Sequence, residues 1–323
     1  MPGYSRPLGA LAVISLLCMA LSVSIGSASL SPFADSWAVL IGTGSPLHQT
    51  LILELRLPRT LSAFATGGLL AVAGALMQVL LRNPLADPYI LGLSGGAAVG
   101  ALLAMLAGFA GAFVSGSAFA GALLATLLVF GLAHGTGSWT PSRLLLTGVV
   151  VAAGWGAIMT LILAMSPARQ LPGMLYWLMG DLSHAANPVA ALVLLTMVCA
   201  LVFPLGRSLN VLARGPLQAA ALGVSVRSLE WLIYVLASLL TAAAVSMAGS
   251  IGFVGLVVPH MLRLVLGNDQ RLILPACALA GGTLLVLADT LARVVIAPEQ
   301  LPVGVITALL GVPTFLYLLY RSR

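Results

Sequence analysis

"LRLPRTLSAFATGGLLAVAGALMQVLLRNPLADPYILG", residues 55–92, holds a long apolar run between two polar ends. No charged residue occurs between Arg59 and Arg82, and a helix needs about 20 apolar residues to cross the core of a bilayer. Glycine and alanine recur along this run, and small residues allow membrane helices to pack closely. The stretch therefore predicts a tightly packed transmembrane helix that ends in a proline-containing turn.

The rest of the chain has the same apolar composition. Of its 323 residues, 60% are hydrophobic and 7% are charged, and the mean hydropathy is +1.12. So few polar residues cannot cover the surface of a soluble globule of this size. The net charge of +6 comes from 14 basic residues, all of them arginine, against 8 acidic ones. These arginines stand singly between apolar runs, which favours a membrane protein over a nucleic-acid-binding protein.

Charge-free runs recur along the chain and together predict ten membrane-spanning helices. Two runs are too long for one helix, and we expect them to break at glycine-rich turns within residues 108–116 and 247–252. The expected fold is an all-α integral membrane protein with one transmembrane domain over residues 1–323. The first span could instead be a cleaved secretory signal, because Arg6 precedes an apolar stretch that ends in small residues. The predicted spans are approximately residues 8–28, 60–81, 89–108, 117–134, 143–165, 188–206, 229–248, 252–266, 272–293 and 302–320.

The distribution of arginine predicts the orientation of these helices. Cytoplasmic loops are enriched in positive residues. Ten arginines fall on the side that holds both termini: Arg6, Arg82, Arg143, Arg207, Arg214, Arg227, Arg263, Arg271, Arg321 and Arg323. Four fall on the opposite side: Arg56, Arg59, Arg169 and Arg293. We therefore expect both termini in the cytoplasm and the second group on the outer face.

Three connections have distinctive sequences. Residues 82–92 combine two prolines with Asn83 and Asp87, which predicts a stiff turn. Residues 206–231 contain "PLQAAALGV", a short helix ended by Gly223, which could bind a cytoplasmic partner or lie against lipid. Residues 166–188 contain a short aromatic helix with Tyr176 and Trp177, typical of interface aromatics or of a mobile gate.

The sequence offers little for catalysis. A phosphate-binding loop needs lysine, and the chain has none, so we expect no ATP hydrolysis by this chain itself. The histidines are dispersed, and Cys18, Cys199 and Cys277 lack metal-ligand spacing. We therefore predict no catalytic residue, metal or cofactor bound by this chain. Asp289 is the one carboxylate placed within a span, either as an ion site or, as we favour, paired with Arg293 four residues later.

Two long segments, residues 55–101 and 249–319, closely resemble the FecCD family, permease subunits of ABC importers for iron-siderophores, haem and cobalamin. The similarity includes "YWLMGDL" and "AALGV" and covers essentially the whole chain. It implies a ten-helix subunit, with helices two to five and seven to ten related as inverted repeats, in a homodimer or heterodimer in the bacterial inner membrane. Two cytoplasmic subunits would use ATP and magnesium, and a periplasmic binding protein would deliver the substrate. The implied substrate is an iron chelate such as a ferric siderophore, with haem or cobalamin as alternatives.

The resemblance also implies roles for individual residues. Arg56, Arg59 and Arg293 match the arginines that receive the binding protein. Thr140 and Ser142, in "SWTPSR", match the cytoplasmic gate region. The segment that couples to the ATPase comprises Arg214, Pro216, Leu217, Ala220, Leu222, Gly223 and Val224. The alternative from another class is a secondary transporter or channel, for which Asp289 is the candidate ion site.

Overall fold

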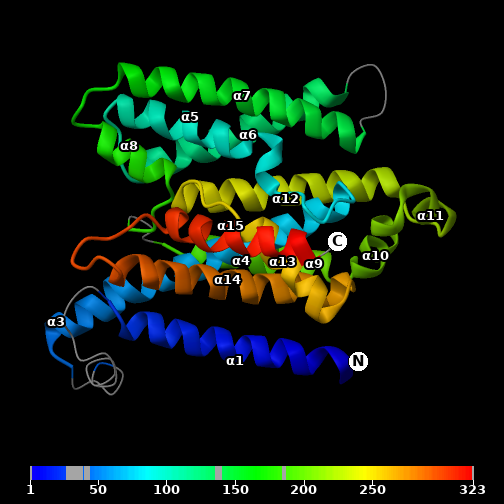
Figure 1. Ribbon diagram of the computed structural model, residues 1–323, viewed down its shortest axis with the longest axis horizontal. Helices are drawn as coiled ribbons and strands as arrows, with labels where there is room; N and C mark the ends of the chain where they lie inside the picture. The colour runs from blue at the N-terminus through cyan, green and yellow to red at the C-terminus, as the bar shows by residue number, and fades with distance from the viewer. Residues whose placement is uncertain (1, 27–38, 40–43, 135–139, 184–186, 322–323) are drawn as a thin grey trace.

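The protein is described from a computed structural model that defines the placement of residues 2–26, 39, 44–134, 140–183 and 187–321. Within these residues the ordered elements are all helical, and no strand is present (Figure 1). The expected all-α fold is therefore confirmed. The first turn of α1 and the last turn of α15 lie toward the end of the molecule that carries α10 and α11, opposite α3 and α8 (Figure 1).

The helices follow one another along the chain in the order labelled in Figure 1. Their bounds are α1 Pro2–Ser24, α3 Pro46–Gln49, the π-helix η1 Thr50–Arg56, α4 Leu57–Leu80, the 3-10 helix η2 Pro88–Leu91, α5 Leu93–Leu106, α6 Ala112–His134, α7 Pro141–Met165, α8 Leu171–Leu178, α9 Val189–Val202, α10 Gly206–Arg214, α11 Pro216–Ala221, α12 Val226–Ala248, α13 Val254–Leu266, α14 Gln270–Val294 and α15 Val303–Arg321.

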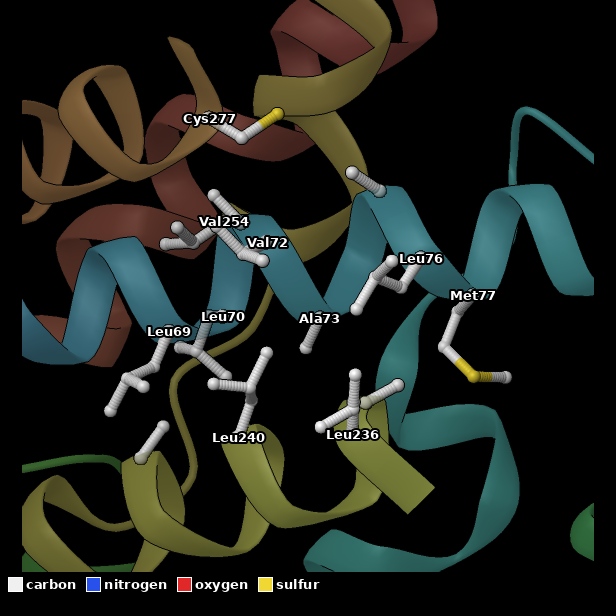
Figure 2. Close-up of a cluster of buried hydrophobic side chains, with 14 of the residues drawn as sticks. Leu69, Leu70, Val72, Ala73, Leu76, Met77, Leu236, Leu240, Val254 and Cys277 are labelled. Atoms are coloured by element: carbon white, nitrogen blue, oxygen red, sulfur yellow. The ribbon is translucent and has the colours of Figure 1, made fainter. Parts of the chain in front are cut away.

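Helix α4 is the centre of the bundle. It packs against α12, α13 and α14, and nearly all of its side chains from Thr60 onward are buried. Figure 2 shows Leu70 and Leu76 of α4 on the side of the helix that faces Leu240 and Leu236 of α12. A β-carbon on Gly74 would collide with the backbone carbonyl of Gly255, so α4 and α13 touch main chain to main chain. The small residues of the opening stretch therefore permit close packing, as predicted.

The outer helices present apolar side chains to their surroundings. α1 and α7 lie at opposite edges of the molecule (Figure 1). Leu17 of α1, Leu127 of α6 and Leu146 of α7 are each more than half exposed. Large exposed apolar surface of this kind is stable only against lipid or a partner.

The lengths of the helices support a multi-pass membrane protein. Among the described residues, six helices are long and apolar enough to cross a membrane, and a seventh span arises if α9 and α10, bent by 71°, count as one. Helices α5, α13 and α15 are apolar but shorter. Ten crossings therefore remain a prediction.

Glycine residues end two helices where the sequence predicted, and one helical segment begins earlier than predicted. α5 ends at Leu106 and α6 begins at Ala112, with positive φ at Gly108 and Gly111. α12 ends at Ala248, where Gly249 has φ 69°, so both glycine-rich breaks are confirmed. Helical structure before α4 begins earlier than residue 60, because η1 continues into α4 through Arg56.

Candidate functional site

The C-terminal end of α14 carries a buried charged cluster around Asp289. The Asp289 carboxylate accepts a bond of 2.8 Å from Nη2 of Arg59, and Nε of Arg59 lies 3.1 Å from both carboxylate oxygens. Nε of Arg293 lies 3.1 Å from Oδ2 of Asp289, which confirms the predicted pair. The side chain of Asp289 is 1% exposed, so two arginines compensate the charge of one carboxylate inside the protein.

The same cluster binds the end of α1. Nη1 of Arg56 donates to the carbonyls of Val23 (3.2 Å) and Ser24 (3.0 Å). Nη2 of Arg293 donates to the carbonyl of Ser22 at 3.2 Å and to its Oγ at 2.8 Å. The last carbonyls of a helix lack helical partners and carry partial negative charge, so arginine is a suitable cap. Arg56 and Arg293 therefore hold α1 against α4 and α14.

The structure thus brings the three predicted docking arginines together, but Arg56 and Arg293 are buried. Arg56 is 7% exposed and Arg293 is 4% exposed. Arg59 has 14% of its side chain exposed, and its Nη1 donates to Oε1 of Gln300 at 2.7 Å. Arg59 is therefore the most accessible of the three, and the docking role of the group stays a prediction.

The segment after α7 forms the expected short helix, α8. Within α8 the side chain of Met174 is buried, while that of Tyr176 is exposed. The chain after α8 turns at Gly180, with φ 81°, and the amide of Asp181 donates to the carbonyl of Ala248 at 2.8 Å. This backbone bond joins α8 to the break between α12 and α13.

The turn before α5 is stiff, as residues 82–92 predicted. Oδ1 of Asp87 accepts from the amide of Tyr89 at 2.7 Å and caps η2. The Tyr89 hydroxyl donates to the carbonyl of Ile251 (3.1 Å) and accepts from its amide (3.2 Å). Burial raises the pKa of Asp87 to about 6, and the bond from the Tyr89 amide opposes this shift. The turn is therefore tied to the start of α13.

The predicted coupling segment forms a projecting helix, α11. Gly215, with φ 139°, separates it from α10, and Gly223, with φ 78°, follows it. Leu217 is 86% exposed and Leu222 is 71% exposed, whereas Ala219 is fully buried. The remaining residues of the coupling prediction, Arg214, Pro216, Ala220 and Val224, lie along the same segment. Leu217 on α11 and Leu222 directly after it together form an exposed apolar contact surface.

The predicted gate residues lie at the start of α7. Oγ1 of Thr140 accepts from the amide of Arg143 at 3.3 Å and caps the helix, and Ser142 is exposed in its first turn. Residues 135–139, which precede them, lie outside the described part of the chain. The gate assignment of Thr140 and Ser142 stays a prediction.

The profile of the FecCD transport family matches residues 13–321. The chain belongs to this family. The cobalamin import system permease protein BtuC of Halobacterium salinarum is 42% identical over 306 residues, covering 88% of this chain and 79% of the relative. The hemin transport system permease protein HmuU of Yersinia pestis is 39% identical and covers 95% of each chain. A solved inward-facing ABC transporter of the metal-chelate type has a TM-score of 0.86 at 30% identity, covering 98% of this chain and all of that one.

This FecCD chain is therefore an ABC importer permease with several apolar helices in a membrane. The charged cluster at Asp289 was only partly evident from sequence. The spacing of Asp289 and Arg293 predicted their pairing, but Arg59 lies 230 positions away and only packing brings it there. Among the described residues, no three His, Cys, Asp or Glu side chains gather where they could hold a metal.

Proposed function

We propose that this FecCD permease imports a metal chelate of the tetrapyrrole class, cobalamin or haem, across the inner membrane. The observation that carries the proposal is the similarity, over most of both chains, to relatives named for cobalamin and hemin transport. A ferric siderophore, expected from the resemblance alone, is the competing substrate class. Both classes are metal chelates, in keeping with the metal-chelate transporter of similar structure.

The proposed assembly places two permease chains around a central path. Two ATP-binding subunits lie on the cytoplasmic side, where the arginine distribution predicts both termini, and a periplasmic binding protein docks outside. Exposed Leu217 and Leu222 support α11 as the contact with an ATP-binding subunit, because burying two leucines is strongly favourable. ATP-driven closure of those subunits would move α11 and, through it, the helices around the path.

For the outer face we propose docking through Arg59, with Arg56 and Arg293 supporting it from beneath. Acidic groups on a binding protein would pair with the accessible edge of Arg59, and such pairs set orientation and association rate more than affinity. Replacing Arg59 with glutamine, which removes its charge without placing a second carboxylate beside Asp289, is expected to slow association with the binding protein about threefold or more at low salt. Surface plasmon resonance measures this, with exposed Arg169→Gln as the control.

A secondary transporter is the weaker interpretation. Its coupling ion would need a carboxylate with free oxygens, but both oxygens of Asp289 are engaged by Arg59 and Arg293. An ion would have to displace an arginine to bind there. The pairing of Asp289 therefore favours a structural role.

Uptake into proteoliposomes tests the proposal. The permease is reconstituted with its ATP-binding subunit and binding protein, and uptake of cyanocobalamin, haemin and a ferric siderophore is compared. We expect ATP-dependent uptake of cobalamin or haem, unchanged by ionophores and absent with a catalytically inactive ATPase. Uptake of the siderophore alone would overturn the substrate class, and gradient-driven uptake without the ATPase would overturn the importer mechanism.

A further inference from the structure

A cavity of about 600 Å³ lies where α4, α10, α13 and α14 meet, at the end of the molecule near α10. Its lining includes Arg82, Arg214 and Arg263, with Asp269 as its acidic residue. Arg214 belongs to the predicted coupling segment, whereas Arg82 and Arg263 have no role in the transport and docking proposed above. The cavity therefore calls for an explanation of its own.

The charge of the cavity is positive, because its carboxylate is already fully engaged. Oδ1 of Asp269 accepts from Nδ2 of Asn210 at 2.9 Å and from Nε of Arg271 at 3.1 Å. Oδ2 accepts from Nη2 of Arg271 at 2.8 Å and from the Tyr4 hydroxyl at 2.5 Å. The bonds from Arg271 contribute most, and together with those from Tyr4 and Asn210 they hold the pKa of Asp269 well below its usual range. The carboxylate thus has Arg271, which is outside the cavity lining, as its counter-ion.

The three cavity arginines have no such neutralising partner. Within the described part of the chain, no ion pair joins Arg82, Arg214 or Arg263 to an acid. Glu230 of α12, which is not in the cavity lining, influences Arg82 only through space. Three guanidinium groups around one cavity repel one another, so an anion bound among them would be stabilised.

Arg263 is held in place before any ligand arrives. Oε1 of Gln78 accepts a hydrogen bond from Nη1 of Arg263. Nε2 of Gln78 donates to the carbonyls of Ala86 (3.3 Å) and Leu256 (3.2 Å), and Gln78 is buried. A group that is ordered in advance loses little entropy on binding. Gln78 therefore orients Arg263 on the wall of the cavity.

Gln270 supplies a second, independent indication of a ligand. It lines the cavity, is 2% exposed, and its Oε1 has no hydrogen-bond partner. A buried acceptor without a donor is rare, because its lost hydration is not replaced. A rotation of this lining side chain would turn Oε1 into the cavity, where a ligand hydroxyl group would satisfy it while the arginines bind an anionic part of the same ligand.

We propose that this cavity binds a phosphate ester that carries a hydroxyl group, such as glycerol phosphate. Arginine recognises phosphate by paired hydrogen bonds, and basic pockets between helices on the cytoplasmic side can bind lipid head groups. The ester is either a free metabolite or the head group of phosphatidylglycerol. The lipid source requires the proposed orientation of the chain, whereas the site itself is independent of the transported substrate.

Thermal unfolding of the complete importer in phosphatidylcholine nanodiscs tests the free ester. Glycerol phosphate is titrated against wild type, Arg82→Gln and Arg143→Gln. Arg82 has a φ of 48°. Glutamine, like arginine, would have to adopt this conformation, so the substitution removes the charge without changing the backbone strain. We expect Arg82→Gln to weaken binding roughly tenfold, since hydrogen bonds to charged groups contribute strongly. Exposed Arg143, outside the cavity lining, is the matched control and should bind as wild type does.

A second variant examines the hydroxyl contact. Gln270→Met keeps the length of the side chain and removes the acceptor. Wild type is expected to prefer glycerol phosphate to sulfate, which has no hydroxyl donor, and Gln270→Met should lose that preference while still binding sulfate. Equal preference in the two proteins would overturn the hydroxyl part of the proposal.

Native mass spectrometry separates the two sources. Phosphatidylglycerol retained by wild type and Arg143→Gln, but lost from Arg82→Gln, would identify a lipid head group. Stabilisation by glycerol phosphate in phosphatidylcholine discs without retained lipid would identify a free ester. The proposal is overturned if all three proteins behave alike, or if binding occurs only without the ATP-binding subunit, because an acidic segment of that subunit would then fill the cavity. Uptake of cobalamin or haem reports separately on the proposed function.

Discussion

At the residue scale, Asp289 links α1, α4 and α14 at one end of the bundle. It pairs with Arg59 of α4 and Arg293 of α14, and Arg293 in turn holds the last turn of α1. All of these groups are largely removed from solvent. Loss of the single carboxylate would leave two arginines without their counter-ion.

Replacing Asp289 with asparagine is therefore expected to destabilise the protein by about 3–5 kcal/mol, the usual cost of breaking a buried pair. Thermal unfolding in detergent measures the effect. Glu299→Gln is the matched control, because it removes an exposed carboxylate at the same end of the molecule. An unfolding temperature of Asp289→Asn equal to that of the control would contradict the structural role.

The raised pKa of Asp87 predicts a dependence of stability on pH. Because the folded protein holds this proton up to a pKa of about 6, it binds more protons than the unfolded chain between about pH 4 and 6. The protonated Asp87 side chain therefore contributes its full stabilisation below about pH 4, and this contribution is lost as the pH rises through about 6. Asp87→Asn keeps the cap on Tyr89 and should become more stable than wild type by order of 1–3 kcal/mol at pH 7, but not at pH 4. Unfolding temperatures of both proteins across this range provide the measurement, and a constant difference would refute the assignment.

At the scale of elements, the contact between α4 and α13 depends on the absence of side chains. Gly74 and Gly255 meet through their backbones, so any larger residue must separate the helices. Tyr89, Gln78 and Arg263 also form hydrogen bonds across this region. The junction is therefore both closely packed and polar.

Gly74→Ala should destabilise the protein by about 1–3 kcal/mol through overpacking. Gly156→Ala in α7 is the control, because a β-carbon there meets no atom within 4 Å. Alanine favours helix relative to glycine, so the control is expected to match or exceed wild type. Unfolding temperatures distinguish the two variants, and equal values would show that the helices can separate freely.

At the scale of the whole molecule, apolar runs and glycine-rich breaks were sufficient to predict the helical segments. The charge-free run from Thr60 to Leu81 lies in α4, and the glycines near residues 108 and 249 lie in the turns after α5 and α12. Contacts between distant segments could not be predicted in this way. The partner of Asp289 on α4 and the burial of Arg56 depend on how helices pack, which periodicity does not encode. The bend of 71° after α9 was missed for the same reason.

Assembly with the ATP-binding subunit should depend on the exposed leucines of α11. The double substitution Leu217→Ser and Leu222→Ser is expected to weaken assembly about tenfold or more, because the apolar contact is lost. Co-purification quantified against the permease measures it, with exposed Gln218→Ser as a control on the same helix. Normal co-purification of the double variant would place the contact elsewhere.

The sharing of Asp289 also affects how the outer end of the molecule acts at a distance. Three arginines with one aspartate carry less net positive charge than three arginines alone, and two of them lie beneath the surface. An approaching acidic protein would therefore experience a weaker long-range attraction than three exposed arginines would give, and the accessible edge of Arg59 would supply most of it, since the Debye length is about 8 Å at physiological ionic strength. The association rate would fall as the salt concentration rises, but less steeply than for three fully exposed arginines.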